Sequence, residues 1–416
     1  MKTVLVIGSG GREHAIVDAL SRSPRVGKIY CAPGNAGIAA QAECVPIKDT
    51  DVSGLVEFAS SHSVDLTVVG PEASLAAGVT DAFRASGLKI FGHSKAATRI
   101  ESSKEFAKVL MEKYSIPTAA YRSFTDYDEA LAYVSSRPLP AVLKYDGLAA
   151  GKGVVIAETL AEAQAALKDM LVGCSYGQGK VVVEDYLQGP EFSFMCFVDG
   201  SRVYPMPLAQ DHKRAFDGDK GPNTGGMGAY TSLPFITSED REFALSNILQ
   251  RTADAMVAEG CPLSGVLYGG LMKTDGGVKV IEFNARFGDP ETEVVLPLFE
   301  GDIYSLFEAV AGGVPAEQPL WSSDVTLGVV LASKGYPGSY GKGFPIELPA
   351  EGKIYHMGTA LSEGKYVTAG GRVLMCVARA SSLKEALSEA YSLVGEVRCE
   401  NLFYRNDIAH IALEQQ

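Results

Sequence analysis

Long apolar runs are missing from this chain of 416 residues. Its most apolar stretches, such as residues 4–7 and 325–331, are far shorter than the roughly 20 residues that a membrane-spanning helix needs. An apolar signal region is missing as well, because residues 1–3 lead directly into a strand-like segment without a small-residue cleavage site. We therefore expect no membrane partner and a location in the cytoplasm.

Clusters of basic residues and paired cysteines are also missing. The 37 lysines and arginines are outnumbered by 50 aspartates and glutamates, and the net charge of −13 disfavours binding to a polyphosphate backbone. The seven cysteines are scattered, without a C-x-x-C pair or a His/Cys group at zinc spacing. The sequence therefore predicts no nucleic-acid partner, and it predicts reduced, mostly buried thiols.

Apolar side chains are plentiful enough for a folded, multidomain protein. Hydrophobic residues make up 46% of the chain, which excludes disorder throughout, and the length predicts two to four domains. Residues 1–102 alternate short β-branched runs with helical patterns, which predicts an N-terminal open parallel βαβ domain of Rossmann-like α/β type. Residues 103–325 predict an α+β core with a small mobile lid over 123–188, and residues 326–416 predict a small C-terminal α+β domain.

Many of the 45 glycines fall in loops that follow predicted strands. Residues 8–11 (Gly-Ser-Gly-Gly) follow the first strand and open a helix, a context in which a phosphate rests on a helix N-terminus. The dinucleotide fingerprint is only partial, because Glu13 replaces a small residue and the second strand ends at Cys31 without an acid for the ribose. NAD is therefore disfavoured, and a tight turn without a ligand remains the alternative. The loops at 33–37 and 70–71 also follow strands, so all three should converge at one sheet edge.

The segment from Lys144 to Gly153 nearly matches a phosphate-binding P-loop. Its two glycines before Lys152 are one residue too close, Gly153 replaces the magnesium-binding Ser or Thr, and β-branched residues follow instead of a helix. A strand, a glycine-rich turn and a second strand remain, which indicates a flexible flap whose backbone amides close over phosphates. An ordinary hairpin with a surface lysine is the weaker alternative.

An acidic connector follows the predicted strand at 181–183. The backbone at 184–187 offers groups that pair with an adenine edge, and Glu184 or Glu191 offers an acceptor for ribose or amino hydrogens. Acids that follow a strand are more often simply solvated, and that alternative stays open.

Oxygen donors alternate along the strand predicted at 278–283, which follows the turn Asp275-Gly276. Period-2 geometry places Glu282, Asn284 and Arg286 on one face and Phe283 on the other. A carboxylate beside an amide oxygen suits a magnesium ion that bridges phosphates, and the arginine can neutralise a transferring phosphoryl group. The alternative is a polar strand face turned to solvent.

A long loop begins at Asp211-His212-Lys213-Arg214 and becomes glycine-dense over 221–228. It is too long for a mere connector, and its backbone amides can form an anion nest to which Lys213 and Arg214 add charge. A plain charged turn is possible for the first four residues. His212 is either a general base or, more often for a lone histidine in a polar loop, a solvated side chain.

Taken together, these segments are similar to a known family. The flap at 144–153, the connector at 184–187 and the strand residues Glu282-Phe283-Asn284 resemble the ATP-grasp fold. The following strings, in this order, closely resemble the phosphoribosylamine-glycine ligase family (glycinamide ribonucleotide synthetases): 8–14, 32–37, 69–72, 211–214, 221–230, 282–292, 328–330 and 370–373. The resemblance spans almost the whole chain.

The resemblance implies an ATP-dependent carbon-nitrogen ligase of de novo purine biosynthesis that requires Mg²⁺ or Mn²⁺. Its substrates would be glycine and 5-phosphoribosylamine, joined through glycyl phosphate without a covalent enzyme intermediate. We expect a monomer with an ATP-grasp core and a mobile lid.

The resemblance also implies roles for individual residues. Those that would bind ATP are Lys104, Lys144, Gly151, Lys152, Gly153, Glu184, Asp185, Tyr186, Leu187 and Glu191. Glu282 and Asn284 would hold the metal, and the catalytic candidates are Asp211, Lys213 and Arg286. Those that would bind substrate are Gly10, Gly11, Arg12, Asn35, Gly37, Gly70, Pro71, Glu72, Gly225 and Gly226.

The sequence departs from the family pattern at three positions, and three other functions remain as alternatives. Tyr145 replaces a small residue, Pro190 an acid and Leu298 a basic residue, and the strand at 269–272 lacks the carboxylate that would hold a second metal. The rivals are another carboxylate-amine ligase of the same fold, a nicotinamide-dependent oxidoreductase, and a nucleotide-binding protein without turnover.

Overall fold

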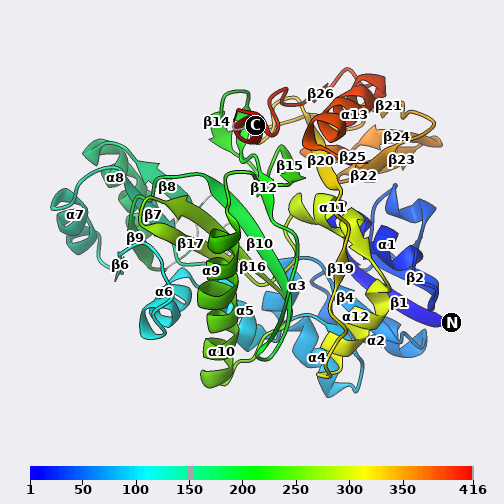
Figure 1. Ribbon diagram of the computed structural model, residues 1–416, viewed down its shortest axis with the longest axis horizontal. Coiled ribbons are helices and arrows are strands. Elements are labelled where there is room, and N and C mark those ends of the chain that lie inside the picture. The colour runs from blue at the N-terminus through cyan, green and yellow to red at the C-terminus, as the bar shows by residue number, and fades with distance from the viewer. Residues whose placement is uncertain (148–152, 174, 176, 178, 415–416) are drawn as a thin grey trace.

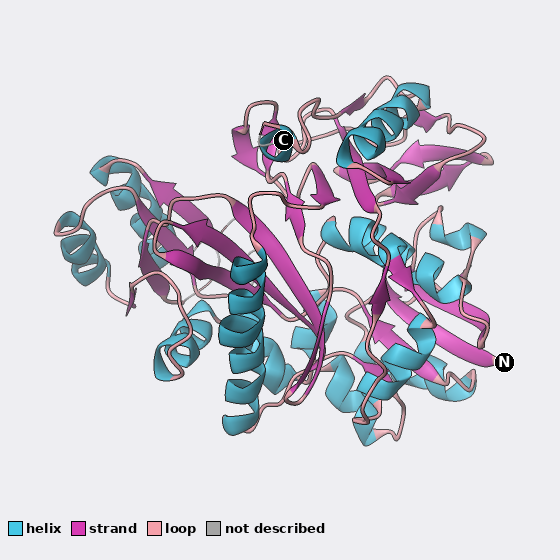
Figure 2. Cartoon of the chain, viewed as in Figure 1, coloured by secondary structure: helices cyan, strands magenta, loops and turns pink. Residues whose placement is uncertain are grey.

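The computed structural model describes residues 1–147, 153–173, 175, 177 and 179–414 (Figures 1 and 2). The predicted flap residues Gly151 and Lys152 lie outside these ranges. Among the described residues, no helix has the length and apolar character needed to cross a membrane.

The N-terminal domain is built on a five-stranded parallel sheet of order β3-β2-β1-β4-β5. Its strands are β1 Lys2–Gly8, β2 Val26–Pro33, β3 Glu43–Cys44, β4 Leu66–Val69 and β5 Ile90–Phe91. Its helices are α1 Gly11–Ser21, η1 Ile38–Ala40, α2 Val52–Ser61, α3 Glu72–Ala77, α4 Val79–Ala85 and α5 Lys95–Ser102. Alternate residues of β1 enter two separate cores, because a parallel sheet is covered on both faces. The prediction of a parallel βαβ domain is confirmed.

The second unit is a four-stranded antiparallel sheet of order β6-β9-β7-β8, seen at the left of Figure 1. Its elements are β6 Tyr121–Phe124, α7 Tyr127–Ser135, β7 Ala141–Tyr145, β8 Val154–Ala157, α8 Leu160–Leu167, η2 Lys168–Val172 and β9 Val181–Asp185. It has its own apolar core, which includes Leu143, Leu167 and Val183. A separate core is what a movable lid requires, and the movement itself stays a prediction.

A ten-stranded antiparallel sheet forms the centre of the molecule, with the main order β17-β16-β10-β12-β15-β20-β25-β22. These strands are β10 Glu191–Asp199, β12 Ala209–Asp211, β15 Gly228–Thr231, β16 Ser264–Thr274, β17 Gly277–Asn284, β20 Val325–Ser333, β22 Lys353–His356 and β25 Arg372–Ala380. The strands β11 Arg202–Pro205 and β26 Leu402–Phe403 pair with β10 and β20. The C-terminal strands therefore share main-chain hydrogen bonds with the central unit, since Tyr230 pairs with Leu327.

Helices cover one face of this sheet, and the N-terminal domain and the helical segment at 291–311 lie against the other. Along β10, Phe194 and Cys196 face the helical side, while Met195 and Phe197 enter the core shared with the N-terminal domain. The helical elements of this part are α6 Lys104–Lys113, α9 Ser238–Phe243, η3 Ala244–Gln250, α10 Arg251–Ala258, α11 Glu291–Val295, η4 Leu296–Leu298, α12 Ile303–Ala311, α13 Leu383–Glu396 and α14 His410–Leu413. The remaining strands are β13 Arg214–Phe216, β14 Lys220–Asn223, β18 Phe299–Glu300, β19 Leu320–Trp321, β21 Pro345–Ile346, β23 Thr359–Ser362 and β24 Lys365–Thr368.

Candidate active site

The end of β17 presents the predicted oxygen donors. Gly270 pairs with Glu282 while Leu271 pairs with Val280, so Ile281 is the extra residue of a β-bulge. Beyond the bulge, Glu282 and Asn284 are two positions apart and share a face, and Phe283 is buried on the other face in the helical core. The predicted alternation is confirmed for Glu282, Phe283 and Asn284, whereas Arg286 lies beyond the end of β17 and is not part of a strand face.

Positive side chains converge on Glu282. Burial raises the pKa of this carboxyl. The opposite effect of the nearby cations is larger, and the resulting pKa is about 2; these cations are Lys104, Lys213, Lys144 and Arg286. Glu282 is therefore ionised at neutral pH. Lysine and arginine side chains gathered at one place suit a polyphosphate ligand.

Lys144 lies in a buried charge cluster beside the bulge. Its Nζ donates to the Ile281 carbonyl oxygen at 2.8 Å and lies 2.9 Å from Glu184 Oε1. The other oxygen of Glu184 lies 2.9 Å from the Nζ of Lys108, whose side chain is only 3% exposed. One carboxylate thus links two buried lysines, and the predicted adenine contact of Glu184 stays a prediction.

Lys108 was not predicted from the sequence. It lies one helical turn after Lys104 on α6, and this i, i+4 spacing is the signal that places both ammonium groups on one face. Burial lowers the pKa of Lys108, Glu184 raises it and Lys144 lowers it, which leaves the pKa at about 8. Lys108 Nζ also donates to Thr118 Oγ1 at 2.8 Å.

The described part of the flap is anchored to the start of α6. The Asp146 carboxylate accepts from Ser103 Oγ at 3.0 Å and from the Glu105 N–H at 3.1 Å. Tyr145 is buried in the lid core, and its N–H donates to the Gly153 carbonyl at 2.8 Å. The start of the flap therefore lies beside Lys104, which is predicted to bind the phosphates of ATP.

The connector after β9 is more open. Asp185 forms an ion pair with Arg137, and Tyr186 is 39% exposed. Pro190 accepts a backbone hydrogen bond from Lys273 at 3.0 Å.

The Leu298 side chain is 1% exposed in η4, so the position where the resemblance places a basic residue is apolar and buried here.

The residues predicted as catalytic extend the site along β12 and the following loop. Lys213 Nζ lies 2.7 Å from Glu191 Oε2, which brings a predicted catalytic residue to the predicted ribose ligand. Burial raises the pKa of Asp211, Lys213 lowers it, and Glu291 and Glu191 raise it, to a final value of about 7. Burial lowers the pKa of Lys213, but Glu191 and Asp211 raise it well above its ordinary value, so Lys213 stays charged.

Arg286 joins this site to the N-terminal domain. Its Nε lies 3.4 Å from Glu72 Oε2 and 3.3 Å from Glu101 Oε1. Its Nη2 donates to Asn284 Oδ1 at 3.4 Å, a long and therefore weak contact. Burial lowers the pKa of the guanidinium, and the two glutamates raise it above its ordinary value. Glu101 was not predicted from the sequence.

The three N-terminal loops meet at one edge, as predicted. Asn35 Nδ2 donates to the Ser9 and His356 carbonyl oxygens, at 2.8 Å each. Glu13 Oε2 accepts from the Gly10 N–H at 2.6 Å, and a Cβ placed on Gly70 would lie 1.9 Å from Glu13 Oε1. The Glu13 carboxylate thus caps the N-terminus of α1, and the expectation that NAD is disfavoured stays a prediction.

The other predicted substrate residues line the same junction. Arg12 and Gly37 are packed against neighbours: Arg12 Nη1 donates to the Phe287 carbonyl at 3.2 Å, and a Cβ on Gly37 would lie 2.1 Å from His356. Gly11 begins α1, and Pro71 precedes α3, whose first residue is Glu72.

The Gly225-Gly226 turn reaches this junction from the central sheet. The Gly225 carbonyl accepts from Arg372 Nη1 at 2.7 Å, and Arg372 Nη2 lies 2.9 Å from Asp289 Oδ1. Gly226 has φ +111°, and a Cβ there would lie 2.4 Å from Pro290, so glycine is required. Arg372 was named only within a resembling string, without a role, and the structure brings it to the site.

Three family models together match most of the chain. They describe the phosphoribosylglycinamide synthetase N domain over residues 2–101, the ATP-grasp (A) domain over residues 102–292 and the C domain over residues 326–411.

Whole proteins match as well. The chain is 50% identical to a phosphoribosylamine–glycine ligase of Halalkalibacterium halodurans, an alignment that covers 99% of this chain and 98% of that one. It is 48% identical to the protein of the same name from Pseudomonas aeruginosa, over 99% of each chain. The crystal structure of phosphoribosylamine–glycine ligase from Thermotoga maritima superposes with a TM-score of 0.88, at 34% identity, covering 98% of this chain and 100% of that one.

Proposed function

The chain belongs to the phosphoribosylglycinamide synthetase family, and on this basis we propose that it joins glycine to 5-phosphoribosylamine at the expense of ATP in purine biosynthesis. One observation of the site carries the proposal. Lys104, Lys144, Lys213 and Arg286 surround the ionised carboxylate of Glu282, at a junction reached by the three N-terminal loops. Such a site can hold a triphosphate and a second phosphorylated substrate close together.

The reaction divides into two steps. A carboxylate oxygen of glycine attacks the γ-phosphorus, the bond to the β,γ-bridging oxygen breaks, and ADP leaves with that electron pair. The amine of 5-phosphoribosylamine then attacks the carbonyl carbon of glycyl phosphate, loses a proton and displaces phosphate. Both steps need positioning and charge neutralisation more than covalent chemistry by the protein.

Glu282 and Asn284 fit a magnesium or manganese ion. Glu282 is ionised, and among the residues that the structure describes, the amide oxygen of Asn284 accepts just the long contact from Arg286. Within the described ranges, no group of three or more His, Cys, Asp or Glu side chains could hold a metal unaided. The two oxygens therefore suit an ion that takes its other ligands from nucleotide phosphates and water. When bound, such an ion would neutralise phosphate charge.

The chain's own residues then divide the work. Lys104, Lys144 and the flap would bind the phosphates, the connector at 184–187 the adenine, and Glu191 the ribose. Lys213 and Arg286 would offset the charge of the acyl phosphate. The residues at 10–12, 35–37, 70–72 and 225–226 would enclose 5-phosphoribosylamine.

Asp211 is suited to accept the proton that the attacking amine loses. A base with a pKa near the working pH combines availability with driving force, and the pKa of Asp211 is about 7. Because the carboxylate is the active form, kcat should fall as the pH drops below about 7. Asp211→Asn should lower kcat by ~100-fold and remove this acid limb.

Asp275→Asn, in the exposed turn between β16 and β17, is the matched control and should retain the wild-type profile. The measurement is kcat as a function of pH from 5.5 to 9 for the wild type and both variants. An unchanged acid limb in Asp211→Asn would assign the limb to another group.

Lys108→Met should weaken ATP binding although Lys108 is not a predicted ATP ligand. Without Lys108, the buried Glu184 carboxylate would be neutralised by Lys144 alone, which would then be less available to phosphates. We expect KM for ATP to rise about tenfold, equivalent to about 1.4 kcal/mol. Breaking a buried pair should also reduce the free energy of unfolding by about 3 kcal/mol.

Lys113→Met is the control on the same helix, because Lys113 is 59% exposed and pairs with Glu259 at the surface. It should change neither quantity measurably. Wild-type KM for ATP in a folded Lys108→Met protein would separate Lys108 from nucleotide binding.

The proposed function is tested by substrate dependence. Purified protein is given ATP and Mg²⁺ with glycine, other amino acids or bicarbonate, each with and without 5-phosphoribosylamine. Glycinamide ribonucleotide should form, with one ADP and one phosphate, only when glycine and 5-phosphoribosylamine are both present. Equal or better use of another carboxylate would support a different ligase of this fold, and NADH binding would revive the oxidoreductase.

We place this activity in the cytoplasm, and a monomer remains our expectation. The six cysteines within the described ranges are free thiols, in keeping with a reducing compartment. Gel filtration with light scattering would test the monomer.

A further inference from the structure

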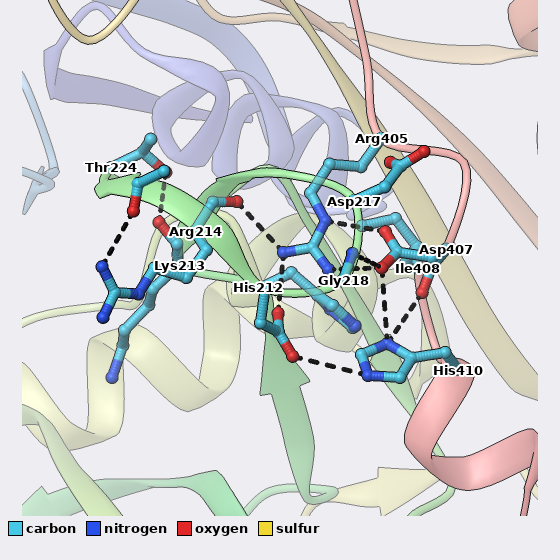
Figure 3. A network of polar contacts seen from close by, with 12 residues as sticks. His212, Lys213, Arg214, Asp217, Gly218, Thr224, Arg405, Asp407, Ile408 and His410 are labelled. Carbon is cyan, nitrogen blue, oxygen red and sulfur yellow. Dashed lines mark hydrogen bonds and ion pairs between the residues drawn. The ribbon is translucent and has the colours of Figure 1, made fainter.

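The loop between β12 and β15 lies beside the last turns of the chain, and a buried arginine links them (Figure 3). Arg405 has no exposed surface. Its Nε and Nη2 each lie 2.8 Å from an oxygen of Asp407, so this pair is bidentate. Its Nη1 lies 2.9 Å from Asp219 Oδ1 and donates to the Arg214 carbonyl at 3.0 Å.

Neighbouring residues strengthen this link from both sides. Asp407 Oδ2 also accepts from the Gly218 N–H at 2.7 Å. The Asp217 carboxylate accepts from the backbone N–H and the side-chain amide of Asn406, at 2.8 and 2.9 Å. The carboxylates of Asp217 and Asp219 in the loop therefore bind the C-terminal segment, and the carboxylate of Asp407 in that segment binds the loop.

His212 makes a second attachment on the other side of Lys213. The imidazole is 3% exposed, and its Nε2 accepts from the Ala409 N–H at 3.2 Å. Burial lowers its pKa and nearby Arg405 lowers it further, to about 3, so the ring is neutral. The alternative that this histidine is solvated is wrong, and a pKa of about 3 makes the ring too weak a base for general-base catalysis at neutral pH.

Lys213 lies between these two attachments along the chain, but its side chain does not take part in them. Its side chain extends away from the Arg405 guanidinium (Figure 3) and reaches Glu191 at 2.7 Å. Its carbonyl oxygen accepts from the Thr224 N–H and hydroxyl at 2.7 and 2.9 Å. The C-terminal segment thus holds the residues before and after Lys213, and the loop itself holds its carbonyl.

We propose that Arg405 is a positioning residue that fixes Lys213 for the attack of glycine on ATP. The inference rests on the proposed function, which places Lys213 at the acyl phosphate that glycine forms. A buried ion pair gives little net stability over apolar packing of the same shape. The bidentate geometry of the Arg405 pair does, however, restrict the loop to one conformation, and a displacement of about 1 Å remote from the chemistry can slow a reaction ~100-fold.

The test uses the full-length protein with three variants and one control. Arg405→Met removes the link, and Arg405→Lys keeps one charge without the fork. Asn406→Ala, at an exposed position, removes only the side-chain amide contact to Asp217 and keeps the backbone one. Arg379→Met is the control, since Arg379 binds Asp324 and the Pro297 carbonyl away from the loop. Steady-state kinetics are measured for glycine and ATP separately, and hydrogen exchange is followed across residues 212–224.

We expect Arg405→Met to lower kcat/KM for glycine by ~100-fold and to raise KM for ATP by a smaller factor, because Lys213 also pairs with the predicted ribose ligand Glu191. Arg405→Lys should recover part of the loss, and Asn406→Ala should show a smaller change in the same direction. A loss of folded protein would lower kcat without changing either KM, so a raised KM for glycine distinguishes positioning from instability. Exchange should become faster in 212–224 and stay unchanged in the N-terminal domain.

Wild-type glycine kinetics and exchange in Arg405→Lys and Asn406→Ala would overturn the inference, even if Arg405→Met does not fold. Equal loss for glycine and ATP would overturn it as well. Failure of the wild-type protein to use glycine at all would instead contradict the proposed function, so the two failures are distinguishable.

Discussion

Glu282→Ala is expected to lower kcat by on the order of 100-fold or more, about 3 kcal/mol of lost transition-state stabilisation. Glu282 supplies the ionised oxygen of the proposed metal site, and Asn284 alone would offer only a neutral amide. The substitution also leaves Lys104, Lys144, Lys213 and Arg286 without their shared carboxylate. Their mutual repulsion should misplace the phosphates that they would bind, which adds to the loss.

The measurement is initial-rate kinetics across a magnesium titration, with thermal unfolding to establish that each variant is folded. Glu282→Asp keeps the charge on a shorter side chain and should retain intermediate activity with a raised magnesium requirement. Glu259→Ala removes a surface carboxylate that pairs with Lys113, and it should behave as wild type. Wild-type turnover in Glu282→Ala would show that the metal is held elsewhere.

Lys144→Met should raise KM for ATP and lower kcat together, each by about tenfold or more. Its ammonium group is placed to act on the bound triphosphate and on the charge that develops during transfer, so both ground state and transition state lose a contact. The same change removes a hydrogen bond to the bulge carbonyl of Ile281. Part of the effect would therefore come from a less well fixed Glu282.

Lys353→Met provides the control for Lys144→Met, because Lys353 pairs with Asp18 in another part of the molecule. Both variants are compared at several ATP concentrations, from limiting to saturating. A Lys144→Met enzyme with wild-type rates at every concentration would remove this lysine from the site.

The sequence predicted well what depends on local pattern. Alternating β-branched runs and helical patterns identified the parallel sheet, and the two-residue spacing of Glu282 and Asn284 gave their shared face. The positions of glycine-rich loops after strands predicted that Asn35 and Gly70 would approach the first loop. Each of these inferences needs only residues that are close together along the chain.

What the sequence did not predict depends on long-range contacts. Lys108 became significant only because Glu184 lies between it and Lys144, and Arg405 because a distant loop folds against it. The bulge at Ile281 is a matter of register with β16, which no local pattern specifies. The continuity of the central sheet through β15 and β20 is likewise a pairing between distant segments.

The most direct test of the account is a crystal structure with magnesium and a non-hydrolysable ATP analogue. The account predicts the metal within coordination distance of Glu282 and Asn284, and the phosphates between that ion and the Lys104 and Lys144 ammonium groups. Nucleotide bound over the N-terminus of α1 or at any other place, with these side chains left without it, would contradict the central claim.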